Sequence, residues 1–187
     1  ASPDGPFQEA VRLTRRAVMG ETASVLARAP AHVWDRSGSL DVALYGGSLS
    51  AASERDVLDG ANRAAVETAP GVWEALQFAG AELIAPSTWR LSGLLRGQAG
   101  TESAMAEALA AGARFVLLDA AVARMPGGAE AQGSHWALRL GPAGASPDDA
   151  AFADAQADYA ARGRLPFAPG HVQAARAGGD LVLSWVR

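Results

Sequence analysis

The chain of 187 residues contains no cysteine and no lysine. The absence of cysteine excludes disulfide bonds, thiolate catalysis and cysteine metal sites. All 16 basic residues are therefore arginine, so a phosphate loop that needs a lysine cannot form. No uninterrupted apolar run approaches the ~20 residues that a membrane-spanning helix needs. At 187 residues the chain is nevertheless long enough to bury a hydrophobic core of its own.

Charge of either sign is also modest. With 16 basic and 20 acidic residues the net charge is −4, which argues against a general nucleic-acid-binding surface. The chain begins with Ala1 rather than Met and stops at Arg187 within a strand-like run. We therefore expect it to be a segment of a longer protein.

The most informative stretch is residues 89–102, Trp-Arg-Leu-Ser-Gly-Leu-Leu-Arg-Gly-Gln-Ala-Gly-Thr-Glu. A period of two predicts a strand with these residues on one face: Trp89, Leu91, Gly93 and Leu95. Gly97 and Gly100 then predict a turn. Thr101 is expected to be the N-cap of a helix over residues 103–111.

Short strand-like segments recur along the chain with little helix between them. The expected strands are residues 31–35, 40–45, 61–68, 72–84, 88–96, 114–118 and 134–140. Residues 36–39 predict a hairpin connection, and Pro86 suggests that its two flanking strands form an antiparallel pair. Helical patterns are expected at residues 6–28, 50–58 and 148–161.

This spacing favours a mainly β fold with a few short helices, either an antiparallel barrel or a sandwich, because long helices between strands are mostly missing. The run Leu-Pro-Phe-Ala-Pro-Gly at residues 165–170 predicts a stiff extended connector. Beyond it, residues 172–176 and 181–186 flank two glycines and predict a hairpin. This hairpin resembles the opening strands of a fibronectin type III-like module, with Trp185 where such modules bury a tryptophan.

Candidate catalytic motifs are weak. The glycines at 93, 97 and 100 superficially resemble a phosphate loop but lack its lysine, so a strand-end turn is the better interpretation. The run Gly-Gly-Ser-Leu-Ser at residues 46–50 lacks the second glycine of a nucleophile elbow and predicts a turn. No carboxylate spacing suggests a cell-wall hydrolase.

Metal and ligand sites are not predicted either. His32, His135 and His171 have no ligand spacing and are interpreted as partly exposed strand residues. The acidic group Asp148, Asp149, Asp154 and Asp158 lacks the order and glycine of a calcium loop and predicts a solvated helix face.

Two larger sets of residues, the tryptophans and the strand arginines, were also considered as binding residues. The tryptophans, expected to pack in the core rather than to bind sugars, are Trp34, Trp73, Trp89, Trp136 and Trp185. The strand arginines, expected either to pair with acidic neighbours at an interface or to face water, are Arg90, Arg96, Arg114 and Arg139.

Residues 89–102, read with Trp-Glu-Ala-Leu-Gln-Phe-Ala at 73–79 and Gly-Ala-Arg-Phe-Val-Leu-Leu-Asp at 112–119, resemble one family. It is the host-specificity or tail-tip protein of siphophage-like tails and of gene transfer agents, a baseplate hub of the "megatron" type. The resemblance covers most of residues 30–187 and is much weaker over residues 1–29. It implies three parts: an N-terminal segment 1–29 of uncertain role, a β-rich hub domain 30–164, and a connector with the start of a fibronectin-like domain 165–187.

The resemblance also implies a function. We expect a structural tail-tip component rather than an enzyme, with no catalytic residue, cofactor or metal site. The implied partners are other tail-tip and baseplate proteins, further copies of the chain in a threefold ring, and the host cell envelope. The implied location is the tail tip of a particle made in the bacterial cytoplasm. The competing hypothesis is a carbohydrate- or receptor-binding β-domain that acts directly in host adhesion.

Overall fold

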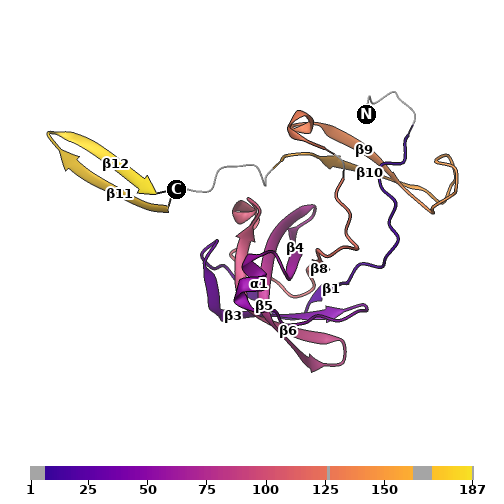
Figure 1. Cartoon of the computed structure of the whole chain (residues 1–187), viewed down its shortest axis with the longest axis horizontal. Coiled ribbons are helices and arrows are strands. Elements are labelled where there is room, and N and C mark those ends of the chain that lie inside the picture. Colours follow the sequence, from indigo (N-terminus) through magenta and orange to yellow (C-terminus); the bar gives the residue numbers. More distant parts are fainter. Residues whose placement is uncertain (1–6, 126, 162–169, 187) are drawn as a thin grey trace.

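The computed structural model describes residues 7–125, 127–161 and 170–186. Its centre is a closed six-stranded antiparallel barrel with the strand order β1-β3-β6-β5-β4-β8 (Figure 1). The barrel strands are β1 (Met19–Thr22), β3 (Trp34–Leu44), β4 (Arg63–Ala69), β5 (Val72–Ala85), β6 (Thr88–Gln98) and β8 (Arg114–Leu117). The expected mainly β architecture is confirmed, and of the two alternatives the fold is a barrel.

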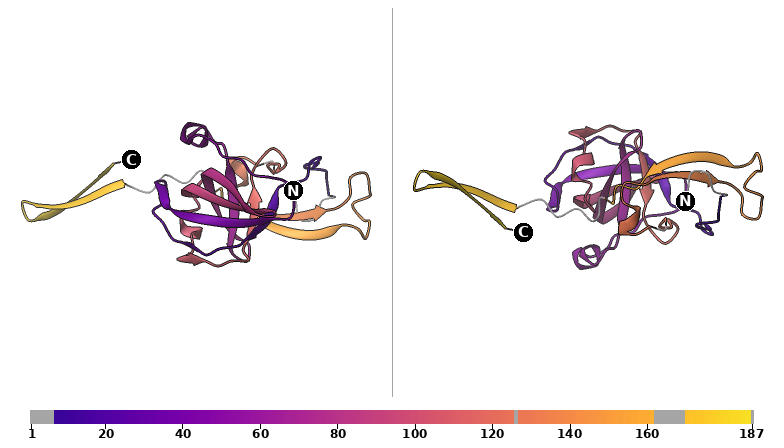
Figure 2. Two further views of the ribbon diagram at one scale, coloured as in Figure 1. Left: turned by 90° about the horizontal axis from the view of Figure 1, so that it is seen from below. Right: turned by 90° about the horizontal axis from the view of Figure 1, so that it is seen from above.

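Smaller elements surround the barrel. The two-stranded sheets are β2 (Leu26–Ala27) with β7 (Ala108–Leu109), β9 (His135–Leu140) with β10 (Ala153–Asp158), and β11 (Gly170–Ala177) with β12 (Asp180–Val186). Helix in the described ranges consists of α1 (Glu54–Leu58) and two 3-10 turns, η1 (Glu102–Ala104) and η2 (Ala129–Ala131). The β9–β10 and β11–β12 hairpins project on opposite sides of the barrel (Figure 2). No helix within the described residues has the length and apolar character that a membrane-spanning helix requires.

Apolar side chains fill the barrel interior. On β3, every second residue from Leu40 to Leu44 is buried, as expected for a strand with one face toward a core. The same cluster contains, from the other barrel strands, Ala64, Val66, Leu76, Phe78, Leu91, Leu94 and Phe115. The interior is therefore a packed core rather than a pore.

At Gly93 the set of alternate β6 side chains that points into the core changes. Residues 88–98 form the predicted strand, and Trp89 and Leu91 lie on its core side as expected. Leu94, only three residues after Leu91, is also in the central cluster, whereas Leu95 is buried outside it. Gly93 has a φ of +59°, a conformation that glycine adopts without steric cost. The prediction of one common face is thus correct before Gly93 and wrong after it.

The helix expected over residues 103–111 is wrong. In its place are the three-residue turn η1 and the short strand β7. Thr101 makes no side-chain cap bond. Its hydroxyl accepts the Ala75 N–H at 2.9 Å and donates to the Gln98 carbonyl at 2.7 Å. The Thr101 side chain, which the sequence pattern assigned to a helix cap, instead forms hydrogen bonds with β5 and β6.

Two further helix predictions are wrong for a similar reason. Residues 148–161 contain the strand β10, whose Asp154 and Asp158 lie directly opposite Arg139 and His135 of β9. These cross-strand pairs outweigh the helix propensity of the alanines. In the described part of the range 6–28, from residue 7 onward, the regular elements are the strands β1 and β2.

The hairpin expected at residues 36–39 is also wrong, because β3 continues through them as an irregular stretch of one strand. Other local predictions are confirmed. The β5–β6 and β11–β12 pairs are antiparallel, and Gly178 and Gly179 at the second turn have φ of +61° and +95°. Helix α1 falls inside the predicted 50–58 and begins at an N-cap, Ser53. The connector at 165–169 and the side chain of Trp185 lie outside the described residues, so the fibronectin-like module stays a prediction.

One ion pair is fully buried in the wall of the barrel. Arg96 of β6 donates to both carboxylate oxygens of Glu74 on β5 at 2.6 and 2.8 Å, and both side chains are 0% exposed. Arg96 also donates to the Ala27 carbonyl at 2.9 Å, and the Gly97 N–H donates to Glu74 at 3.2 Å. The pair therefore ties β5, β6 and the β2 segment together.

Substituting Glu74→Gln should lower the free energy of unfolding by about 3–5 kcal/mol, because Arg96 would keep a buried charge without its counter-ion. Urea denaturation followed by tryptophan fluorescence measures the change. The matched control is Asp41→Asn, which removes the partner of the exposed Arg90 and should have a much smaller effect. Equal losses in the two variants would contradict the role of the buried pair.

Substituting Gly93→Ala should lower the free energy of unfolding by about 1–2 kcal/mol, because the left-handed conformation is costly for a residue with a Cβ atom. That Cβ would also approach the Ala79 Cβ at 3.2 Å. Gly46→Ala is the control, since its Cβ would meet nothing within 4 Å and its φ is not positive. If the two variants have equal thermal unfolding midpoints, the positive φ of Gly93 does not explain the change of the core-facing side chains in β6.

Candidate binding groove at the split edge of the barrel

The seam between β1 and β3 opens partway along β3. The two strands pair from Gly20 opposite Leu44 to Thr22 opposite Val42. One further contact follows, in which the Ala23 N–H donates to the Asp41 carbonyl at 2.6 Å and the Asp41 N–H donates to Ser24 Oγ at 2.9 Å. The chain then leaves β3 and pairs with β7 instead. Among the described residues, no strand covers the β1-side edge of β3 before Asp41.

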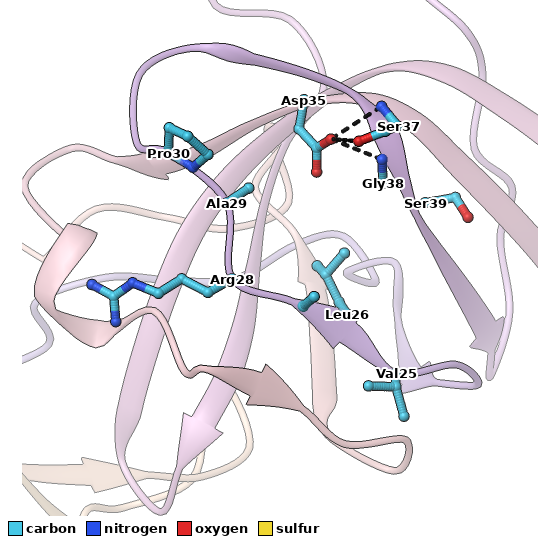
Figure 3. A pocket seen from close by; sticks show the side chains of 10 residues that line it. Val25, Leu26, Arg28, Ala29, Pro30, Asp35, Ser37, Gly38 and Ser39 are labelled. Atoms are coloured by element: carbon cyan, nitrogen blue, oxygen red, sulfur yellow. Dashed lines mark hydrogen bonds between the residues drawn. The ribbon is translucent and has the colours of Figure 1, made fainter.

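A groove of about 460 Å³ fills this opening (Figure 3). One wall is the segment Val25 to Pro30, and the other is Asp35 with residues 37–39 of β3. Val25, Pro30 and Ser39 are exposed. The groove is therefore open to solvent and accessible to a ligand without movement of the barrel.

Asp35 is the charged side chain of the β3 wall and lies beside Ser37 and Gly38 (Figure 3). Its Oδ1 accepts the Gly38 N–H at 2.7 Å, the Ser37 N–H at 3.1 Å and the Ser37 hydroxyl at 3.1 Å. The Gly38 N–H is the largest cause that lowers the Asp35 pKa below its ordinary value, with further lowering from Ser37 and from the positive charge of Arg96. Oδ2 accepts no hydrogen bond from the described residues and is the free acceptor in the groove.

The two charged residues that line the groove are Asp35 and Arg28. Arg96 is the cation whose field reaches Asp35, but its own charge is already balanced by the bidentate pair with Glu74. Arg28 also borders the groove, yet its guanidinium donates away from Asp35 to the Met105 carbonyl and to Glu107 (Figure 3). Asp35 is thus ionised at neutral pH, held in place by backbone donors, and open to a cationic partner.

The sequence pattern did not single out this site. Asp35 was expected to end a strand, and residues 36–39 to form a hairpin connection. An aspartate at such a position also predicts an Asx turn, in which the carboxylate accepts N–H groups two or three positions later. That local signal identifies the bond from Gly38 to Asp35 but not the opening of the barrel beside it. The opening depends on where β1 leaves β3.

The two glycine-containing motifs singled out in the sequence lie in ordinary backbone structure: residues 93–100 at the end of β6 and the turn after it, and residues 46–50 in an irregular segment. The turn after β6 contains Gly100, with a φ of +75°, whereas Gly97, with a φ of +61°, is still part of β6, so the predicted turn begins later than expected. Residues 47–50 have no regular structure, and α1 begins only at Glu54, so no strand-to-helix elbow surrounds Ser48.

The histidines and the acidic residues do not gather into one site, although Asp148 and Asp154 both pair with Arg139. His135 and Asp158 form an exposed pair at 2.5 Å, and Asp154 pairs with Arg139 at 2.7 Å. His32 lies in a turn with a φ of +61° rather than in a strand, with its Nε2 4.0 Å from Glu102. The side chain of His171 lies outside the described residues. Within the described ranges, no group of three or more His, Asp or Glu residues could hold a metal ion.

All five tryptophans lie in strands, but their packing differs from the expectation of core residues. The four whose side chains are described are half-buried, and Trp89 is the one that packs against the central cluster. Trp34 and Trp73 lie beneath the guanidinium groups of Arg36 and Arg114, with distances of 5.8 and 5.3 Å to the ring centroids. The four strand arginines all pair with carboxylates of the same chain, on Asp41, Glu74, Glu67 and Asp154.

The geometry defines a class: a small closed antiparallel barrel whose wall splits at one seam. The family described as "Rcc01698-like, C-terminal" matches residues 17–116, more than half of the chain. The chain belongs to this family. The matched residues run from just before β1 to the third residue of β8, so the match and the barrel occupy the same part of the chain. Among curated proteins, none matches.

Titration of Asp35 tests the geometry of the groove. Carboxyl-carbon NMR should give a midpoint below the ordinary value of 3.8, and Ser37→Ala should raise it without restoring that value, because the Gly38 N–H remains. Since the folded-state pKa is lowered, the stabilisation is present above the ordinary pKa and is lost as the pH falls through the folded-state value. A midpoint at or above 3.8 would contradict the bond pattern.

Proposed function

We propose that the chain is a structural, non-catalytic part of the tail tip of a phage-like particle of the gene transfer agent type. In this role it contributes to the hub that closes the tail tube and joins it to the parts that attach to or penetrate the host envelope. The observation that carries the proposal is the coincidence of the family match with the barrel, since the family takes its name from a gene transfer agent-associated protein. The residue resemblance at 73–79, 89–102 and 112–119 supports the same assignment and falls within or next to barrel strands.

The packing of the barrel is consistent with a scaffold. Its interior is occupied by a continuous apolar cluster, which leaves the outer surface and the seam for interactions. The proposed partners are other tail-tip and baseplate proteins and further copies of the chain, arranged with threefold symmetry as the resemblance implies. The proposed location is the tail tip of particles assembled in the bacterial cytoplasm, with the host envelope as the contact on the outside.

One surface feature favours the competing function, direct adhesion to a carbohydrate or receptor. A row of side chains crosses the outside of the barrel: Trp73, Glu67, Arg114, Glu21 and Tyr45. Aromatic rings beside carboxylates and an arginine can hold a sugar by stacking and hydrogen bonds. The polar groups of this row are already bonded to one another, Arg114 to Glu67 and Tyr45 to Glu21, so the scaffold role has the better support.

Labelling of particles tests the proposed location. An epitope tag inserted at the exposed turn of Pro70 and Gly71 should bind gold-labelled antibody at the end of the tail that lies away from the head. Negative-stain electron microscopy gives the readout, with untagged particles as the control. Label along the tail tube or on the head would exclude a tail-tip role.

Adsorption of particles to host cells separates the two functions. For a scaffold, the double substitution Tyr45→Ala and Trp73→Ala should leave adsorption within about twofold of the parent, because aromatic hot spots carry binding only where they contact the receptor. Leu58→Ala is the control, as this residue is 67% exposed and lies outside the row. A drop of about tenfold or more in adsorption of intact particles, absent from the control, would establish direct adhesion instead.

A further inference from the structure

We propose that the groove between β2 and β3 accepts an extended peptide segment of a partner protein. The segment adds a strand to the free edge of β3 and places an arginine or lysine against Asp35. This inference rests on the split seam and its charge, and it does not depend on where the protein is located in a particle.

The backbone of β3 supplies the first argument. Asp41 lies opposite Arg90 of β6, yet its N–H and C=O bond to Ser24 and Ala23 on the other side of the strand. Because the backbone groups of residues two positions apart point to the same edge, the N–H and C=O of Ser39 also point away from β6 and into the groove. Ser39 therefore offers one donor and one acceptor to an added strand, next to Ser37 and Gly38, whose N–H groups are donated to Asp35.

The seam also explains why this edge is free in the folded chain. Around the barrel each strand has a neighbour on both sides, and β8 closes the ring against β1. At the seam, β1 leaves its neighbour after Thr22 and the chain moves to β7, where Leu26 lies opposite Leu109. An edge that is open and bordered by exposed residues favours pairing with another chain.

Charge selects the chemistry of the partner. Asp35 Oδ1 is saturated by three donors from residues 37 and 38, whereas Oδ2 is free within the described structure. The neighbouring Arg96 is neutralised by Glu74, so a basic side chain is the group that balances Asp35. A guanidinium or ammonium group bonded to a fixed carboxylate gives a charge-assisted hydrogen bond, which is stronger than a neutral one.

The opposite wall favours an apolar or β-branched residue beside the basic one. Val25 is 63% exposed and Pro30 is also exposed, and both border the groove. Because alternate residues of a strand point to opposite faces, a segment in which a basic residue alternates with valine, isoleucine or threonine fits both the edge and the walls. The partner is thus an extended basic peptide rather than a helix or an acidic segment.

Selection from a random nine-residue peptide display library, with the purified chain immobilised, tests the proposal. We expect enriched peptides to carry one arginine or lysine among alternating β-branched residues. Synthetic copies should shift the amide NMR signals of residues 37–39, and copies with N-methyl groups on the edge-facing amides should not bind. No enrichment, or enrichment of acidic or helical sequences, would overturn the proposal.

The protein variants complete the test. Asp35→Asn should weaken binding of the selected peptide by about tenfold, the loss expected for one charge-assisted contact. Asp41→Asn is the matched control, with the same loss of charge on the same strand but with its carboxylate paired to Arg90, and it should bind like the parent. Thermal melts establish that both variants are folded. Equal binding by the Asp35 variant and the parent would refute the role of the carboxylate.

Discussion

The arrangement of the barrel depends on the buried ion pair between Arg96 and Glu74. Both side chains are fully buried, and their bonds connect two neighbouring strands with the segment that leads into β2. A buried charge is costly unless its partner is held at hydrogen-bond distance, so the pair favours the alignment of β5 and β6 in which the two groups meet, and the path of the chain that bonds to them. The ion pair also helps to form the groove. Arg96 donates to the carbonyl of Ala27, and Ala27 lies in the groove wall opposite Asp35.

The facing of Arg96 depends in turn on Gly93. Without the positive φ at that position, Leu91 and Leu94 could not both reach the core, and Arg96 would follow the alternation of Leu91 onto the other face. One glycine therefore determines whether the arginine is buried with its partner. A fully buried arginine at the end of an apolar strand is otherwise costly, which explains why the pair is completed by backbone partners on both sides.

The same seam links the fold to the proposed roles. A barrel with a packed interior offers a scaffold that does not need to deform, while the split between β1 and β3 leaves a strand edge and a fixed carboxylate on its surface. For a subunit of a larger assembly, an open edge is a means of attachment, since main-chain bonds supply affinity and side-chain pockets supply selection. The proposed structural function and the proposed binding of a peptide in the groove are thus compatible, and neither requires the other.

The amino-acid sequence by itself determined the mainly β character, the turns at Gly100, Gly178 and Gly179, and the antiparallel pairing around Pro86, because these features depend on local alternation and on backbone freedom at glycine. It did not predict that Thr101 would bond to Ala75, that the alanine-rich residues 148–161 would contain a strand, or that Asp35 would border a groove. Each of these depends on a partner distant in the chain. Only the tertiary structure could decide which of two locally acceptable conformations is completed by a neighbouring strand.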